Sequence, residues 1–244
     1  MEKYTKFEKL GDNCEICVTK EHTFGTDAFL LADFAKVRRK DIVCDLGTGC
    51  GIIAVLMKIR YSPKEVYGID IQQQAIEQFN ITVEHSRLEN VHPLLMDIKQ
   101  LNEGAPFDRC DVVTCNPPYK AADAGIQSEL DAHRIARHEI LCNINDVCAA
   151  ASRLLKFGGR LCLCNRPERL ADVISAMKAN NIEPKCLRFV SKNEHTAPWL
   201  FLIEGRKGGG AFMKVMPQLY MGNGGISPEL AEIYGHHAEN GKEQ

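Results

Sequence analysis

Four consecutive residues, Asn116-Pro117-Pro118-Tyr119, carry the most specific chemical signal in this sequence. An amino group on an aromatic ring or an amide is a poor nucleophile, because its lone pair is delocalised. The Asn116 side-chain oxygen and the Pro117 carbonyl can each accept one N–H of such a group, which points the lone pair at an electrophile. The two prolines fix the backbone, and Tyr119 is suited to stacking on a planar substrate. The run predicts group transfer to a planar amino nitrogen; its alternative is an ordinary turn.

A glycine-rich turn, Asp45-Leu-Gly47-Thr48-Gly49-Cys-Gly51, predicts the donor site. The three glycines let the backbone approach a ligand closely, and the helix expected after them offers free N–H groups. The spacing is GxGxG rather than the GxGxxG of a dinucleotide site, which argues against a nicotinamide-dependent oxidoreductase. An acid followed by exposed N–H groups suits the ammonium and carboxylate of S-adenosylmethionine better than it suits a pyrophosphate. The turn therefore favours S-adenosylmethionine as cofactor.

Two further carboxylates follow expected strands. Asp70 lies 19 residues after Gly51 and can accept two hydrogen bonds from ribose hydroxyls, with Ile71 covering one face of an adenine. Asp97 can accept a hydrogen bond from the exocyclic amine of that adenine, with Ile98 in apolar contact beside it. Each carboxylate has an alternative role as a helix N-cap. Their order along the chain and their place at strand ends carry the prediction.

Alternating strand and helix patterns must position these residues. Apolar runs predict strands at 41–46, 66–71, 91–96, 111–115 and 160–164, and amphipathic runs predict helices at 26–37, 51–58, 72–85, 143–156 and 167–180. Residues 184–191 and 199–206 predict an antiparallel hairpin. We therefore expect an α/β fold of the Rossmann-like methyltransferase type. It is a doubly wound, mostly parallel seven-stranded sheet with helices on both faces and one antiparallel edge strand.

Length and composition bound the organisation. We expect the 244 residues to form a single domain, with a small N-terminal extension at 1–24 and a C-terminal loop and short helix at 208–244. No stretch approaches the roughly 20 apolar residues of a membrane helix, and the N-terminus has no signal core, so we expect a cytoplasmic protein. Eleven cysteines are expected to be mostly buried thiols. The CxxC of Cys14 and Cys17 has no second pair at zinc-finger spacing, so we predict no metal site.

The charge is unevenly distributed, although the net charge is only −2. Residues 151–207 hold eleven Lys and Arg against five Asp and Glu. Such a segment is a candidate contact surface for the phosphates of an RNA partner. A solvated surface with a chance asymmetry accounts for it equally well.

Taken together, these motifs resemble the Asn-Pro-Pro-Tyr class of S-adenosylmethionine-dependent amino-methyltransferases. Within that class the chain is similar to the bacterial tRNA(Val) adenine-37 N6-methyltransferases, over about 24–234. The narrower resemblance rests on FGTDAFLLA from Phe24, ARHE from Ala136, RPER from Arg166 and IYG from Ile233. It implies N6-methylation of an adenine in a tRNA anticodon loop, and it implies that Thr26 lies near the amino-acid end of the cofactor.

The resemblance also suggests which arginines contact phosphate: Arg134, Arg137, Arg166 and Arg169. Arg137-His138-Glu139 has an equally good interpretation as a helix surface with salt bridges. We expect His138 to be structural rather than catalytic, because this chemistry requires no base before transfer.

Several other activities share parts of this pattern. The same four-residue motif serves N5-methylation of a glutamine side-chain amide in a protein, but such enzymes usually carry a sizeable N-terminal helical domain. N-methylation of a ribosomal RNA base usually involves a doubled domain, and a DNA adenine methyltransferase needs a target-recognition region. A non-catalytic binding protein does not require acceptors aimed at an amino group. The tRNA adenine is the preferred substrate, with the glutamine amide and the rRNA base as alternatives.

Overall fold

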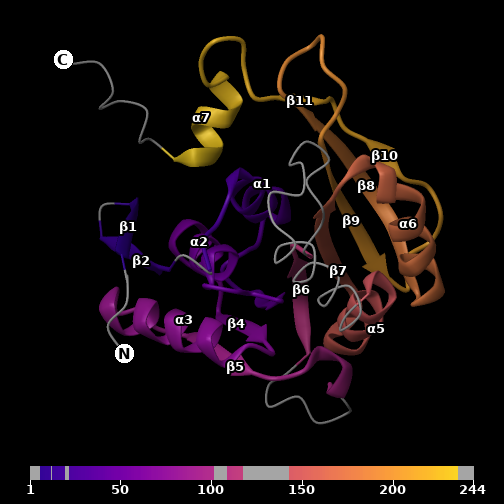
Figure 1. Cartoon of the computed structure of the whole chain (residues 1–244). Helices are drawn as coiled ribbons and strands as arrows, with labels where there is room; N and C mark the ends of the chain where they lie inside the picture. Colours follow the sequence, from indigo (N-terminus) through magenta and orange to yellow (C-terminus); the bar gives the residue numbers. More distant parts are fainter. Residues whose placement is uncertain (1–5, 12, 20–21, 102–108, 118–142, 236–244) are drawn as a thin grey trace, which may run out of the picture.

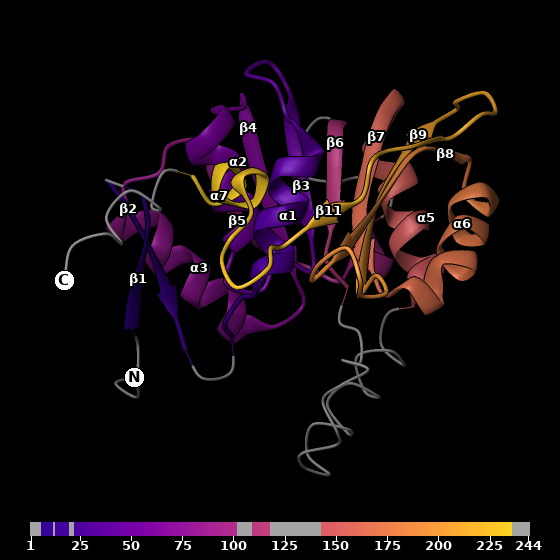
Figure 2. The same ribbon diagram turned by 90° about the horizontal axis from the view of Figure 1, so that it is seen from above.

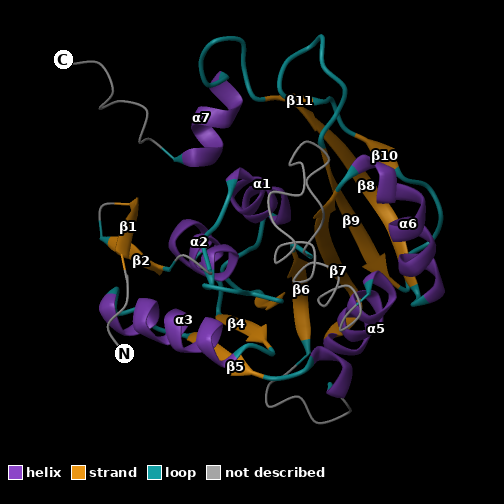
Figure 3. Ribbon diagram, in the orientation of Figure 1, coloured by secondary structure: helices purple, strands orange, loops and turns teal. Residues whose placement is uncertain are grey.

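A mixed sheet forms the centre of this computed structural model, which describes residues 6–11, 13–19, 22–101, 109–117 and 143–235 (Figures 1 and 3). The strand order is β10-β8-β9-β7-β6-β3-β4-β5, and β11 pairs with β8. The strands are β3 Ile42–Leu46, β4 Glu65–Asp70, β5 Val91–Leu95, β6 Cys110–Cys115, β7 Leu155–Asn165, β8 Ile182–Ser191, β9 Leu200–Lys207, β10 Lys214–Val215 and β11 Leu219–Tyr220. Strands β3 to β7 pair in parallel, so their carboxyl ends meet at one edge of the sheet.

The predicted doubly wound, mostly parallel sheet with an antiparallel pair at one side is confirmed. Strand β9 runs antiparallel to both of its neighbours, and it lies between β7 and β8 rather than outside them. Two strands of two residues each, β10 and β11, lie within 208–225, where we expected loop. They pair in parallel with β8 and extend the seven longer strands to nine.

Helices cover both faces of the sheet, as predicted. Helices α1 Thr26–Ala35, α2 Ile52–Tyr61, α3 Gln73–His85 and α7 Pro228–Tyr234 contribute to one hydrophobic cluster. Helices α5 Ile144–Leu154 and α6 Leu170–Ala179 contribute to the other. In Figures 1 and 2, α5 and α6 accordingly lie on the opposite side of β7 and β9 from α1 and α2. Short 3₁₀ turns, η1 Ile98–Gln100 and η2 Pro167–Arg169, follow β5 and β7.

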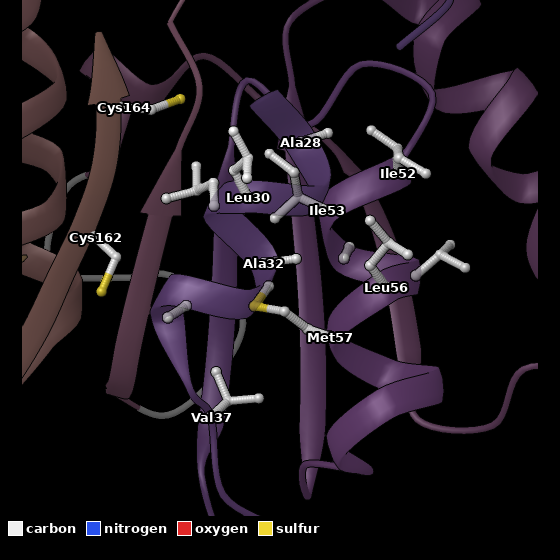
Figure 4. Close-up of a cluster of buried hydrophobic side chains, with 14 of the residues drawn as sticks. Ala28, Leu30, Ala32, Val37, Ile52, Ile53, Leu56, Met57, Cys162 and Cys164 are labelled. Carbon is white, nitrogen blue, oxygen red and sulfur yellow. The ribbon is translucent and has the colours of Figure 1, made fainter. Parts of the chain in front are cut away.

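Alternation along the strands explains why both faces are buried. In β7, Cys162 and Cys164 face the α1–α2 side, whereas Leu161 and Leu163 pack against the α5–α6 side. Figure 4 shows the two cysteines beside the aliphatic side chains of α1 and α2. A strand buried on both faces must be apolar at every position, and burial of each such side chain contributes roughly 1.5–3 kcal/mol. The apolar runs that predicted the strands have this origin.

One predicted boundary is wrong. We expected the helix from Asn143 to continue to Lys156, but α5 ends at Leu154, and Leu155 and Lys156 begin β7. The α5 N-terminus is closed by a capping box between Asn143 and Asp146. At the other end, Leu155 already has an extended backbone and pairs with Cys110. The pairing with β6 therefore overrides the helical pattern at Leu155 and Lys156.

A small N-terminal hairpin completes the described chain. Strands β1 Lys6–Gly11 and β2 Cys14–Val18 pair antiparallel within the segment expected to be a small N-terminal extension. The hairpin packs on α3, where the Thr82 hydroxyl accepts a hydrogen bond from the Cys17 N–H at 3.0 Å. None of the described helices is long and apolar enough to cross a membrane.

Candidate active site

A cavity of about 270 Å³ opens at the carboxyl ends of β3, β4, β5 and β6. The sequence-predicted residues that line it are Gly47, Gly49, Asp70, Ile71, Asp97, Ile98, Asn116 and Pro117. Apolar side chains from β3 and α5 also line it, among them Leu46 and Val147. Pro118 and Tyr119 lie outside the described residues. The parallel sheet thus collects four separate strand-end motifs around one space.

The first two glycines of the turn face this space. Gly47 and Gly49 have φ angles of +67° and +56°, and a Cβ atom added to either would meet no atom within 4 Å. The turn is held by the Ile69 carbonyl, which accepts hydrogen bonds from the Gly47 and Thr48 N–H groups at 2.9 and 3.0 Å. A side chain at 47 or 49 would project into open volume. These positions therefore fit close approach of a ligand to the backbone.

Gly51 has a different role from the other two. A Cβ atom there would lie 2.2 Å from the Phe79 ring, and a Cβ at Gly68 would lie 2.4 Å from the same ring. Phe79 is fully buried and fills the space between α2 and β4. Gly51 and Gly68 thus permit helix–sheet packing beneath the turn. The sequence motif alone does not separate this packing glycine from the ligand-facing ones.

Asp70 connects the glycine turn to the next helix. Its Oδ2 accepts a hydrogen bond from the Gly49 N–H, and its Oδ1 accepts one from the Gln72 N–H, both at 2.9 Å. Helix α3 begins after Gln72, so Asp70 is not its N-cap. The carboxylate is only 5% exposed but lines the cavity. The Gln72 side-chain amide also donates to Oδ1, at a long 3.4 Å, so Oδ2 keeps one free lone pair and a ribose hydroxyl can replace this weak contact at Oδ1.

Asp97 is the N-cap of η1, where its Oδ1 accepts a hydrogen bond from the Lys99 N–H at 2.9 Å. Asp97 therefore has the N-cap role that the sequence offered as an alternative, and it also lines the cavity. Ile98 follows it, and Ile71 stands at the cavity with half of its surface exposed. These apolar side chains next to carboxylates form a wall suited to a flat, polar-edged ring.

The Asn116 amide is held from both of its ends. Its Nδ2 donates to Oδ2 of Asp27 at 2.8 Å, and its Oδ1 accepts from the Cys164 thiol at 3.1 Å. Burial raises the pKa of Cys164 well above its usual range, with the nearby Asp27 and Asp45 carboxylates adding to the shift, so this thiol stays a donor. A thiol is a weak donor and occupies one lone pair of Oδ1. The second lone pair remains available to a substrate N–H.

Asp27 is the site residue that the sequence analysis missed. It lies in the first turn of α1, 89 residues before Asn116 in the chain. Its neighbour Thr26 was predicted instead, and the Thr26 hydroxyl is hydrogen-bonded to the Tyr234 hydroxyl of α7 at 2.7 Å. Thr26 is not among the residues that line the cavity. An acid at the start of a helix is also favourable because of the helix dipole, so its presence in the sequence does not by itself indicate a role in the site.

Asp45 and Thr48 lie beneath the cavity rather than in its wall, and both are buried. Oδ1 of Asp45 accepts a hydrogen bond from the Thr114 hydroxyl at 2.6 Å. Among the described residues, neither Oδ2 of Asp45 nor the Thr48 hydroxyl has a hydrogen-bond partner. Burial raises the pKa of Asp45 to about 7, against the lowering effects of the neighbouring Thr114 and Thr48 hydroxyls. An unsatisfied carboxylate oxygen behind the glycine turn fits a ligand with a positive group.

Of the four arginines proposed for phosphate contact, the two that the structure describes are engaged within the protein. Arg166 donates to the Trp199 carbonyl at 3.0 Å and lies over the Trp199 ring, and Arg169 pairs with Asp172 at 2.8 Å. Arg134, Arg137 and His138 lie outside the described residues. The ten described cysteines, Cys14 and Cys17 included, are free thiols. No cluster of three or more metal-ligating side chains occurs in the described ranges.

Comparison with known proteins places this geometry in context. A family model described as "Methyltransferase domain" matches residues 38–206. The tRNA1(Val) (adenine(37)-N6)-methyltransferase of Aeromonas salmonicida is 29% identical over 178 residues, which cover 72% of this chain and 70% of the relative. A predicted O-methyltransferase of Agrobacterium tumefaciens has a similar structure, with a TM-score of 0.69, 22% identity, and coverage of 85% of this chain and 95% of that one. M. jannaschii TYW2, solved in complex with AdoMet, gives a TM-score of 0.57 at 13% identity, covering 84% and 87%.

Proposed function

The chain belongs to the methyltransferase-domain family and is an S-adenosylmethionine-dependent methyltransferase, and on that premise we propose that it methylates N6 of an adenine in a tRNA anticodon loop. The observation that carries this proposal is the Asn116 amide, which Asp27 orients at the wall of the cavity that also holds the glycine turn. The Aeromonas relative, which is named for this tRNA position, supports the choice of substrate.

We assign the parts of the cofactor to the cavity by chemistry. The backbone at Gly47 and Gly49 receives the amino-acid end, and Asp70 accepts hydrogen bonds from the ribose hydroxyls. Asp97 accepts from the adenine amine, with Ile71 and Ile98 against the ring. Asp45 and Thr48 act from behind the turn on the positive ammonium, and Thr26 supports the α1 end of the site. When bound, the cofactor supplies an electrophilic methyl group on sulfur.

The Asn116 oxygen and the Pro117 carbonyl would then activate the substrate nitrogen. Each accepts one N–H of the adenine amino group, which turns the nitrogen lone pair toward the methyl carbon. With the cofactor bound, the new N–C bond would form as the C–S bond breaks, and the sulfur would keep the bonding electron pair. The methylated nitrogen is cationic and releases its proton to water, so no residue needs to act as a base. In-line placement of the reacting atoms contributes much of the rate.

Asp27 is a positioning residue in this scheme. An amide can sit in two orientations that differ by exchange of its oxygen and nitrogen. A carboxylate accepts hydrogen bonds and cannot donate one when it is ionised, so Asp27 requires the Nδ2 side of Asn116. Oδ1 is thereby fixed as the acceptor for the substrate.

The substrate is tested by transferring labelled methyl groups into total tRNA from cells that lack this protein. Label in N6-methyladenine at an anticodon-loop adenine is the expected result. Label in a glutamine side-chain amide of a protein, or in a ribosomal RNA base, would select one of the alternatives. We also propose a cytoplasmic location, which is supported by the free thiols of the described chain.

A further inference from the structure

A second cavity lies at the opposite edge of the sheet from the active site. It encloses about 540 Å³ at the amino ends of β3, β6 and β7 and the carboxyl end of β9. We call it the amino-edge cavity. Its charged lining consists of six cations, Lys36, Arg38, Lys40, Lys156, Arg160 and Arg206, and three acids, Asp41, Asp111 and Glu204. Half of the cations come from the short link between α1 and β3.

Two of the three acids of this cavity are paired with cations, and the third is buried. Asp111 pairs with Lys156 at 3.0 Å and also accepts a hydrogen bond from the Ile42 N–H. Glu204 pairs with Arg160 at 2.8 Å. Asp41 is buried and accepts a hydrogen bond from the Arg38 N–H at 3.0 Å. These contacts use two of the six cations.

Four cations therefore remain outside any ion pair of the described residues, and the lining holds three more cations than acids. For Lys36, Arg38, Lys40 and Arg206, the described residues provide no hydrogen bond or ion pair to the side chain, and all four are exposed. Separate chain segments bring them to one concave surface, where their like charges repel one another. A low-dielectric wall focuses their field, so the cavity attracts an anion.

An exposed aromatic ring stands at the same cavity. Phe157 is 84% exposed, and its ring is packed on Gly208, where a Cβ atom would come within 2.2 Å of it. Gly208 has a φ of +64°, so the backbone there favours glycine. The ring is thus held in place while most of its surface faces water. Exposed aromatic rings beside a cationic groove are the usual platform for stacking the bases of single-stranded nucleic acid.

We propose that the amino-edge cavity is a second contact for the RNA substrate. Its four remaining cations bind backbone phosphates, and Phe157 stacks on an unpaired base. This inference rests on the proposed function, in which the substrate is an RNA. The cavity floor at Asp111 lies five residues, about 17 Å, from Asn116 along β6. A folded RNA spans this distance, since double-stranded RNA-binding domains contact about 16 base pairs.

The test compares two variants of equal charge. Arg38→Gln/Lys40→Gln removes two cavity cations, and the control Lys9→Gln/Arg87→Gln removes two exposed cations on β1 and after α3. Binding of fluorescent tRNA is measured by anisotropy between 50 and 200 mM salt. We expect the cavity variant to bind several-fold more weakly and its log–log salt slope to fall by about 2, whereas the control keeps the wild-type slope.

A third variant separates stacking from charge. Phe157→Ser should weaken tRNA binding about tenfold and leave the salt slope unchanged. For Arg38→Gln/Lys40→Gln and Phe157→Ser we expect a higher KM for tRNA, an unchanged kcat, and wild-type cofactor affinity by calorimetry, whereas the control should match wild type in all three. If wild-type enzyme methylates tRNA and the cavity variants match it in slope and KM, this inference fails while the proposed function stands. If the cavity variants lose tRNA affinity but no tRNA is methylated, the proposed function fails and the cavity remains an RNA contact.

Discussion

The Asn116 side chain connects helix α1 to strand β7 by hydrogen bonds. Asp27 accepts a hydrogen bond from the Asn116 amide nitrogen, and the Cys164 thiol donates one to the amide oxygen, so the side chain cannot rotate freely. Replacing Asn116 with Ala should lower kcat for methyl transfer by at least about 100-fold, because one prearranged acceptor is lost. Cofactor affinity should stay near the wild-type value. Transfer at the wild-type rate, measured with labelled cofactor, would rule out the acceptor role.

Asp27 offers a test of orientation separate from chemistry. In Asp27→Ala the Asn116 amide loses its charged partner and can reverse, so we expect kcat to fall about tenfold, in line with one hydrogen bond to a charged group. Asp27→Asn should restore part of the activity, because its side-chain oxygen still accepts the Nδ2 proton. Thermal unfolding of both variants controls for the helix-dipole contribution of about 0.3–1 kcal/mol. Equal activity of the Ala and Asn variants would contradict a positioning role.

At the scale of elements, the glycine turn performs two tasks that substitution can separate. Gly51→Ala would place a methyl group against Phe79 at a φ of +84°, so we expect a loss of at least about 2 kcal/mol of folding stability. Gly49→Ala has open space and a φ of +56°, so it should lose only about 1 kcal/mol. Its methyl group enters the cavity, and cofactor affinity should fall. Urea unfolding and calorimetry on both variants check the contrast; equal destabilisation would refute it.

Sequence pattern predicted the elements well where burial imposes a period. The two-faced strands and the amphipathic helices follow from that rule, and so does the placement of Asp70, Asp97 and Asn116 at strand ends. Sequence patterns did not predict the strands whose pairing depends on residues far away in the chain. The β10 and β11 strands have two residues each, too few to show a period, and they exist because β8 has a free edge.

At the scale of the whole molecule, the contacts that complete the site join residues far apart in the chain. Asp27 meets Asn116 across 89 positions, and Thr114 meets Asp45 across 69. Nothing in the local spacing of either pair announces the contact. The same holds for the amino-edge cavity, where the link after α1 meets the end of β9. The excess of Lys and Arg in 151–207 can be counted in the sequence. That residues 36–40 supply half of the cations of the amino-edge cavity cannot be predicted from it.

Global stability should depend on pH through Asp45. Its pKa is near 7 in the folded protein and 3.8 for an ordinary aspartate, so the folded state binds more protons between these values. Asp45 therefore contributes most to the stability of the cofactor-free protein below about pH 4, and this contribution declines as the pH rises to 7. The decline amounts to about 4 kcal/mol. About 3 kcal/mol of this decline falls between pH 5 and pH 8, where urea unfolding measures it, and Asp45→Asn should lose this dependence. An equally steep decline in that variant would assign it to other groups.

Cofactor binding should also change the protonation state of Asp45. A positive ammonium near Asp45 favours the ionised carboxylate, so binding at pH 6 should release a proton that the free enzyme holds. Affinity should accordingly rise between pH 6 and pH 8. Calorimetry in two buffers of different ionisation enthalpy counts the released protons. The Asp45→Asn enzyme separates this effect from titration of the cofactor's own amine, which both enzymes share. If the wild-type and Asn enzymes release the same number of protons, the carboxylate behind the turn does not sense the ligand, and Asp45 serves only to hold Thr114 and the turn in place.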